Sequence, residues 1–168
     1  MNEESIPTWD TANPADSFKA FAVAIHEKAR QTFLQDKTHA EMLFLMPLDG
    51  QGQLVQVTEQ YGDKLSDILK QYVTEHYTFG VLHIAEGWIR LKEGKNDHIF
   101  RQIEAGEMKV SELKEEHRKE ALSVTAQSRD GYSMLWIDEI VRDKSGGVSL
   151  KPAVVFADIK GRFGALFG

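Results

Sequence analysis

Residues 120–158 decide the fold, and they read EALSVTAQSRDGYSMLWIDEIVRDKSGGVSLKPAVVFAD. The stretch contains three runs with strand propensity, which are Glu120–Gln127, Tyr132–Arg142 and Val148–Asp158. The residues between the runs, 128–131 and 143–147, are rich in Asp, Ser and Gly and are typical of tight turns. Because short turns make neighbouring strands antiparallel, the sequence predicts a three-stranded C-terminal meander.

Pro152 marks a special position in the last of these runs. Proline has no amide hydrogen to donate to a neighbouring strand, so within sheets it is confined to edge strands and bulges. We therefore predict that the last strand lies at an edge of the sheet or carries a bulge at Pro152.

Two segments upstream of the meander have apolar residues at helical spacing. We expect Asp16 or Ser17 to cap the first helix, since either side-chain oxygen can accept from a free amide of the first turn. The predicted buried face of this helix consists of Phe18, Phe21, Ala22, Ile25, Ala29 and Phe33. The second helix is expected to begin at Asp63, and its predicted buried face consists of Leu65, Ile68, Leu69, Tyr72 and Val73.

The remaining segments favour strands and short helices. Ala40–Met46, the turn-forming residues 48–52 and Gln53–Thr58 together predict a hairpin. Residues 79–91 have two interpretations: their β-branched and aromatic content favours a long strand, and a helix is the alternative. The charged residues 94–118 are expected to form two short helices around Gly106.

The predicted fold class is α+β, with two amphipathic helices packed on one face of a mostly antiparallel sheet of about six strands. A chain of 168 residues is the usual length of one domain. Residues 1–14 contain Pro7 and Pro14 without apolar periodicity, so we expect a flexible N-terminal arm. Residues 15–168 are then expected to form a single α+β domain.

The composition limits the classes of partner and chemistry. The net charge is −6 and the isoelectric point is about 5.5, and no basic stripe that would grip a phosphate backbone is visible. We therefore expect no nucleic-acid ligand, whereas a basic protein surface stays open as a partner. The sequence has no cysteine, which excludes disulfides, thiolate metal sites and a cysteine nucleophile. Without a secretory signal or a membrane span, we expect a cytoplasmic protein.

Histidines are the candidates for catalysis or metal binding. His83 and Glu86 would share one face of a helix but lie on opposite faces of a strand, so the strand interpretation disfavours a metal site. His76-Tyr77-Thr78 matches half of the paired H-x-[ST] signature of phosphoesterases, and no second copy exists. His117 completes the set of weak catalytic candidates, and His26 and His39 are expected at the surface. No nucleophile elbow, phosphate-binding loop or dinucleotide fingerprint is present, and we expect no cofactor and no metal.

Large apolar residues near the two ends of the sequence are candidates for an interaction surface. They are Trp9, Phe163, Leu166 and Phe167. Exposure of such side chains is unfavourable, so they are expected to dock either on the chain's own core or on a partner or a second copy. The charged run 115–120 is interpreted as a solvated loop that enters a strand.

Three motifs resemble a loosely defined set of uncharacterised bacterial and phage-encoded proteins. They are Ala85-Glu86-Gly87-Trp88, then Glu116-His117-Arg118-Lys119-Glu120-Ala121-Leu122, then Gln127-Ser128-Arg129-Asp130-Gly131 with residues 138–143. The resemblance covers residues 80–145 and implies a strand for Val81–Leu91. It implies a phage or prophage origin but no assigned activity, and it transfers no catalytic residue.

The sequence leads to one main functional hypothesis and two alternatives. The main hypothesis is a non-enzymatic protein-binding or accessory protein, for example a phage-encoded protein that acts on a host protein, with a protein partner or self-association. One alternative is a small metal-dependent hydrolase that uses histidine and carboxylate residues. The other is a small-ligand-binding domain whose pocket lies between the helices and the sheet.

Overall fold

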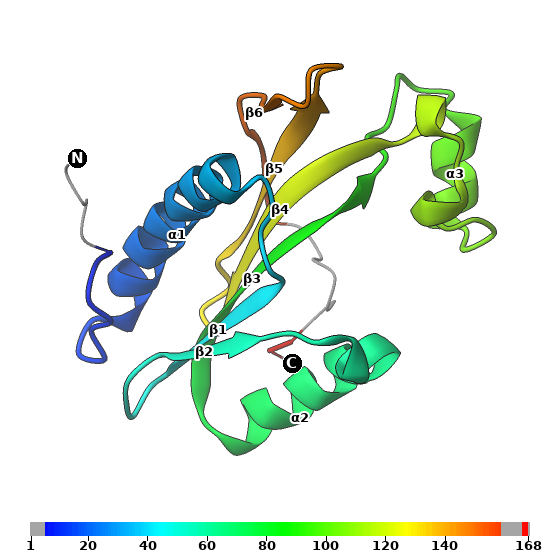
Figure 1. Cartoon of the computed structure of the whole chain (residues 1–168). Helices are drawn as coiled ribbons and strands as arrows, with labels where there is room; N and C mark the ends of the chain where they lie inside the picture. The colour runs from blue at the N-terminus through cyan, green and yellow to red at the C-terminus, as the bar shows by residue number, and fades with distance from the viewer. Residues whose placement is uncertain (1–5, 159–165, 168) are drawn as a thin grey trace.

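The protein is described here from a computed structural model, which describes residues 6–158, 166 and 167 (Figure 1). Within these residues the strands are β1 (Met42–Pro47), β2 (Gln53–Gln56), β3 (Thr78–Ile89), β4 (Lys119–Ser128), β5 (Ser133–Arg142), β6 (Val148–Leu150) and β7 (Val154–Ala157). The α-helices are α1 (Pro14–Asp36), α2 (Leu65–Glu75) and α3 (His98–Glu104). Short 3-10 helices are η1 (Glu59–Lys64), η2 (Val110–Glu112) and η3 (Glu115–His117). The α+β class predicted from the sequence is confirmed.

The strands form one antiparallel sheet in the order β2-β1-β3-β4-β5-β6, and β7 also pairs with β5. The predicted meander is confirmed as β4, β5 and the pair β6 and β7. Pro152 divides the last predicted run, so that β6 pairs with the end of β5 and β7 with its beginning. Pro152 therefore lies at an edge of the sheet, as predicted.

Residues 79–91 are a strand for most of their length, which confirms the strand interpretation. β3 pairs with β1 on one side and with β4 on the other, from Gly80↔Ser128 to Ile89↔Lys119. Gly80 is required because the ring of Phe18 packs directly on the strand: a Cβ at position 80 would lie 2.3 Å from a ring carbon. The glycine lets the fully buried Phe18 fill the space above β3.

The two long helices cover opposite faces of the sheet, which corrects the prediction that they share one face. All six apolar residues predicted for the buried face of α1 are buried, against Leu82, Ile84, Leu122, Val124, Trp136 and Ile140. Leu65, Leu69 and Val73 of α2 pack instead on Leu43, Leu45 and Val81. Because successive strand residues point to opposite faces, the continuous apolar runs of β1 and β3 supply both clusters, and a run of this kind does not reveal which helix packs on which face.

Both long helices begin differently from the prediction. α1 begins at Pro14, which is favoured in the first turn because its missing amide hydrogen has no helical partner there. Asn13 occupies the N-cap position, so neither Asp16 nor Ser17 does. α2 begins at Leu65 after η1, and Ile68, predicted to be buried, is 45% exposed.

The segment from residue 90 to residue 118 extends beyond the end of the sheet and carries α3, η2 and η3 (Figure 1). Asp97 caps α3 by accepting a hydrogen bond from the amide of Phe100 at 3.0 Å. α3 is the first of the two short helices expected around Gly106, whereas the second is reduced to the two 3-10 turns.

No helix among residues 6–158, 166 and 167 has the length and apolar character needed to cross a membrane.

Candidate functional site

The histidine and carboxylate candidates on β3 do not form a shared site. His83 and Glu86 are three residues apart on a strand, so their side chains point to opposite faces. The Nε2 atom of His83 is 2.7 Å from a carboxylate oxygen of Glu41, and His83 is only 3% exposed. Glu86 instead accepts a hydrogen bond from the amide of His39. Each residue thus has its own structural partner.

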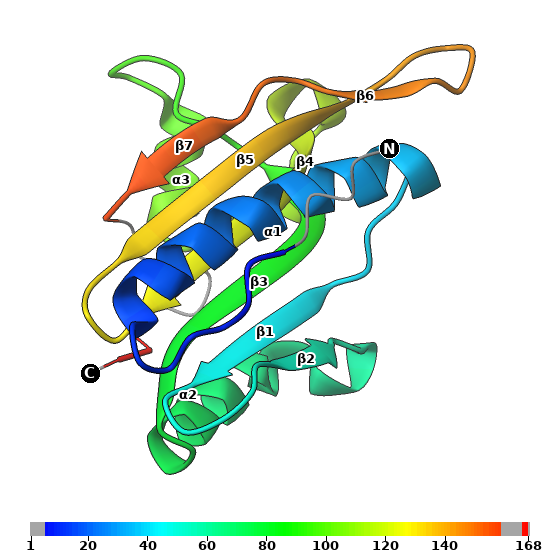
Figure 2. The same cartoon turned by 90° about the vertical axis from the view of Figure 1, so that its left-hand side faces the viewer.

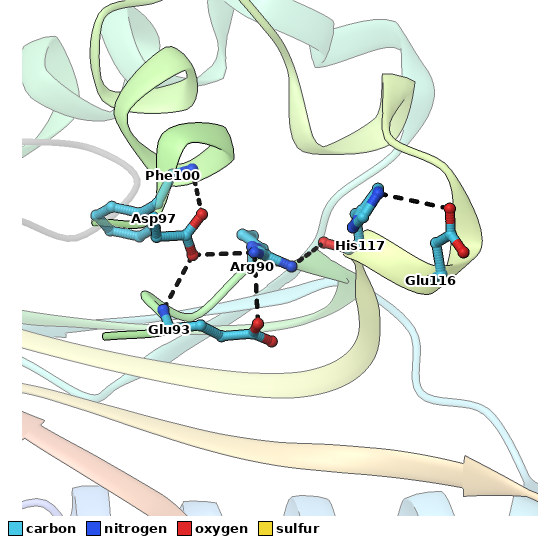
Figure 3. A network of polar contacts seen from close by, with 6 residues as sticks. All are labelled: Arg90, Glu93, Asp97, Phe100, Glu116 and His117. Carbon is cyan, nitrogen blue, oxygen red and sulfur yellow. Dashed lines mark hydrogen bonds and ion pairs between the residues drawn. The ribbon is translucent and has the colours of Figure 1, made fainter. Parts of the chain in front are cut away.

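The other two catalytic candidates lie far apart in the molecule. His76 follows the last turn of α2 and stacks on Tyr72, with ring centroids 4.2 Å apart. His117 lies in η3, where its carbonyl accepts from Arg90 at 3.1 Å and its Nε2 is 3.5 Å from Glu116 (Figure 3). In the part of the chain that the structure describes, no three His, Asp or Glu side chains are placed to hold a metal ion.

Three of the four residues predicted for an interaction surface contact the chain itself. The Nε1 of Trp9 donates to the carbonyl of Pro47 at 2.8 Å, and its ring packs on Phe79. Leu166 is 7% exposed in the cluster under α2, and Phe167 packs beside it. Phe163 lies outside the described residues. Trp9, Leu166 and Phe167 therefore adopt the first of the two predicted arrangements, docking on the chain's own core.

A buried aspartate joins α1 to β5. Asp138 is fully buried, and its two oxygens contact Nε2 of His26 at 2.7 Å and the guanidinium of Arg30. His26, expected at the surface, is buried and stacks on Trp136. Arg30 also donates to the carbonyl of Lys151 at 3.2 Å. These contacts satisfy the carboxylate completely, so we interpret Asp138 as a structural tie between α1 and the β5–β6 side of the sheet.

A second buried aspartate organises the segment that carries α3. Figure 3 shows Asp97 accepting hydrogen bonds from the amides of Glu93 and Phe100 and from Arg90, at 2.9, 3.0 and 3.0 Å. The Glu93 amide first, then the Phe100 amide and Arg90, hold the pKa of Asp97 far below its ordinary value. The carboxylate is thus ionised and fully engaged, and it fixes the start of α3.

Within the described part of the chain, no strand pairs with the outer edge of β2. The amide of Val57 donates to the carbonyl of Glu41, just before β1, at 2.9 Å. Along an antiparallel strand, residues whose backbone groups bond to the neighbouring strand alternate with residues whose backbone groups point away from it. Gln53 and Val55 therefore direct their backbone groups toward β1, whereas Leu54 and Gln56 direct theirs away from the sheet. Among the described residues, β2 pairs only with β1.

A small apolar cavity of about 190 Å³ lies beside this edge, between α2 and the β1–β2 pair. Its lining consists of Leu43, Leu45, Gln53, Val55, Val57, Tyr61, Leu65, Ile68, Leu69 and Tyr72. The hydroxyl of Tyr72 donates to the side-chain carbonyl of Gln53 at 2.8 Å, so these two polar groups satisfy each other. What remains for an incoming group is an apolar surface bordered by the exposed Ile68.

A second hollow of about 400 Å³ lies on the other face of the sheet, between α1 and β1. Ile25 and Ala29 of α1 face Met42 and Phe44 of β1 across it. In Figure 2, α1 crosses the middle strands of the sheet, and β1 and β2 lie to one side of it.

No family model, curated protein or solved structure matches this chain. The candidate site therefore rests on its own geometry. Sequence reasoning missed the β2 edge and its cavity, and the available signal was the apolar stripe of α2. That stripe contains Ile68, but helical periodicity does not show which residue of the stripe lies at the rim of the cavity and is exposed.

Proposed function

We propose that this chain is a non-enzymatic protein-binding module, in which an extended segment of a partner adds to the sheet along the outer edge of β2. Backbone groups of the added strand would bond to those of Leu54 and Gln56, and alternate side chains would enter or pass the adjoining cavity. Main-chain bonds supply affinity in this mode of recognition, and the pocket supplies selectivity.

The observation that supports this proposal is an unprotected edge beside an apolar cavity. Natural proteins commonly block exposed edges with lysine, proline, inward-pointing charges or a covering segment. β2 reads Gln53-Leu54-Val55-Gln56, without charge or proline, and Leu54 is 54% exposed. An edge left open in this way is suited to pairing with another chain.

The resemblance of residues 80–145 to bacterial and phage-encoded proteins suggests one instance of such a partner. A host protein with an accessible extended segment would fit the proposed mode of binding. The geometry of β2 does not depend on the origin of the chain or on the identity of its partner.

The test is selection of random peptides displayed on phage against the full chain, followed by binding to edge variants. Leu54→Pro removes the outward amide hydrogen of β2 without removing a bond to β1. We expect the selected peptides to lose most of their affinity for this variant. Leu34→Gln, at a residue of α1 with 46% exposure, is the control and should bind normally. Peptides that bind Leu54→Pro as tightly as the original chain would contradict the proposal.

A small-ligand-binding role is the second candidate, and the hollow between α1 and β1 favours it. Its volume of about 400 Å³ is within the range of roughly 300–1,000 Å³ that ligand pockets occupy. A panel of apolar metabolites would be screened by thermal shift. Ala29→Phe, which would fill the hollow, should abolish any shift that depends on this site.

A further inference from the structure

The chemistry of the β2 edge allows the partner to be specified more closely, and this step rests on the proposed function. We infer that the partner segment carries one large apolar side chain, leucine or an aromatic residue, that enters the cavity beside α2. We further infer that lysine or arginine residues flank it.

The size and lining of the cavity support a single side chain. Its volume of about 190 Å³ is below the range of roughly 300–1,000 Å³ typical of ligand pockets, so it is small for a cofactor. Its polar pair, Tyr72 and Gln53, is already hydrogen-bonded. The other lining residues are apolar or aromatic, so an apolar group would find most of its contacts with carbon atoms.

The geometry of the strand determines which side chain of the partner enters. Side chains of β2 alternate, and Gln53 and Val55 lie on the face that α2 covers. A strand added to this edge places every second side chain on that face. Because β2 has four residues, only one or two positions of the partner can reach the cavity.

The charge around the site selects the flanking residues. Residues 41–75 contain six Asp or Glu and two Lys, so they carry −4 of the chain's net charge of −6. Asp49, Asp67 and Glu75 are exposed, and so are Lys64 and Lys70. Opposite charges on a partner steer association and favour the correct complex. A second copy of this chain would bring the same negative segment to the interface, so the charge favours a basic partner over self-association.

The experiment uses three synthetic peptides and the full chain, with binding measured by fluorescence polarisation. The reference peptide is KKTVFVTKK, the second replaces Phe with Ala, and the third replaces all four Lys with Glu. We expect each replacement to weaken binding by about tenfold or more: the alanine peptide loses the buried ring, and the glutamate peptide places like charges beside the acidic segment. Binding of the reference peptide should also weaken as NaCl rises from 50 to 300 mM.

Variants of the chain locate the binding. Ile68→Gln should weaken the reference peptide but leave the alanine peptide unchanged, because only the first uses the cavity. Leu34→Gln, matched in exposure, should affect neither.

The possible failures are distinguishable. If the phenylalanine and alanine peptides bind equally and Leu54→Pro abolishes both, the inference about the cavity is wrong and the proposed function stands. Equal binding of the lysine and glutamate peptides would overturn the inference about charge. If neither these peptides nor the selected ones depend on Leu54, the proposed function fails as well. Self-association that Leu54→Pro abolishes, seen by light scattering, would replace the basic partner with a second copy.

Discussion

The two edges of the sheet differ in whether the edge strand is interrupted. At one edge, β6 and β7 are strands of three and four residues separated by Lys151, Pro152 and Ala153. At the other edge, β2 is an uninterrupted strand of four uncharged residues. A proline and a lysine are common devices against unwanted strand pairing. The β6–β7 edge contains both, and β2 contains neither.

The edges also differ in how they are fixed to the rest of the molecule. Arg30 of α1 contacts Asp138 on β5 and the carbonyl of Lys151, so the helix is tied directly to the β6–β7 edge. On the β2 side, Phe21 of α1 packs on Phe44 of β1, and a hollow of about 400 Å³ lies beside this contact. This difference is the physical basis for the proposal that the β2 edge binds a partner.

The largest expected effect is on the tie at the β6–β7 edge. Asp138→Ala leaves the buried His26 and the half-buried Arg30 without the carboxylate, and breaking a buried ionic contact costs about 3–5 kcal/mol. Urea denaturation measures the loss of unfolding free energy. The neighbouring Glu139 lies on the opposite face and pairs with Lys119 and Lys151 near solvent. Glu139→Ala is therefore the control, with an expected cost of about 1 kcal/mol or less. Equal losses for the two variants would contradict the structural role of Asp138.

The second prediction concerns the alternation of backbone groups in β2. Val55→Pro removes an amide hydrogen directed at β1 and leaves its acceptor without a partner, which should cost about 1–3 kcal/mol. Leu54→Pro removes an outward one and should cost about 1 kcal/mol or less by the same measurement. Since the two positions are adjacent, the difference in unfolding free energy isolates the direction of the amide. A larger loss of unfolding free energy for Leu54→Pro than for Val55→Pro would mean that the amide of Leu54, and not that of Val55, bonds to β1.

The fold was predictable where strand-like runs are separated by clear turn residues. It was less predictable where the apolar runs are continuous. The turns at 128–131 and 143–147 and the position of Pro152 follow from local backbone chemistry, and the structure confirms the meander that they predicted. The local sequence did not show which face of the sheet each long helix covers. Leu43, Phe44, Leu45 and Met46 are apolar on both faces of β1, and such a run carries no information on which helix covers which face.

The candidate site was less predictable than the fold. A sheet edge is open when no other strand pairs with it. This depends on the order of the strands in the sheet and not on the residues Gln53–Gln56 themselves. Ile68 was predicted to be buried because periodicity identifies a helical face but not the width of the surface that covers it. The buried position of His26 was missed for a related reason, because its partner Asp138 is 112 residues away in the sequence.

The third prediction compares the turn between β5 and β6 with the strands β1 and β2 at the other edge. In the turn between β5 and β6, the Ser145 hydroxyl first, then the amide of Gly147, lower the pKa of Asp143 from its ordinary value of 3.8. A lowered pKa in the folded state means that the contribution to stability is present above the ordinary value and is lost as the pH falls through the folded value. We expect the amides of Ser145 and Gly147 to lose protection from hydrogen exchange on acidification before those of β1 and β2. Asp143→Asn should remove most of this pH dependence, and an unchanged pH profile in that variant would contradict the assignment.

The smallest effect, and the one that most directly sharpens the contrast between the edges, is the pattern of hydrogen exchange without any substitution. In β2 the amides of Val55 and Val57 are directed at β1 and should be protected, whereas those of Leu54 and Gln56 should exchange rapidly. In β7 the amide of Asp158 donates to Ser133, so Phe156 should be protected and Val155 should exchange. A bound peptide that adds to β2 must slow Leu54 and Gln56 and leave Val155 unchanged. Slowing at Val155 instead would move the binding edge to β7, since only an added strand can occupy those outward groups without disturbing the inward ones.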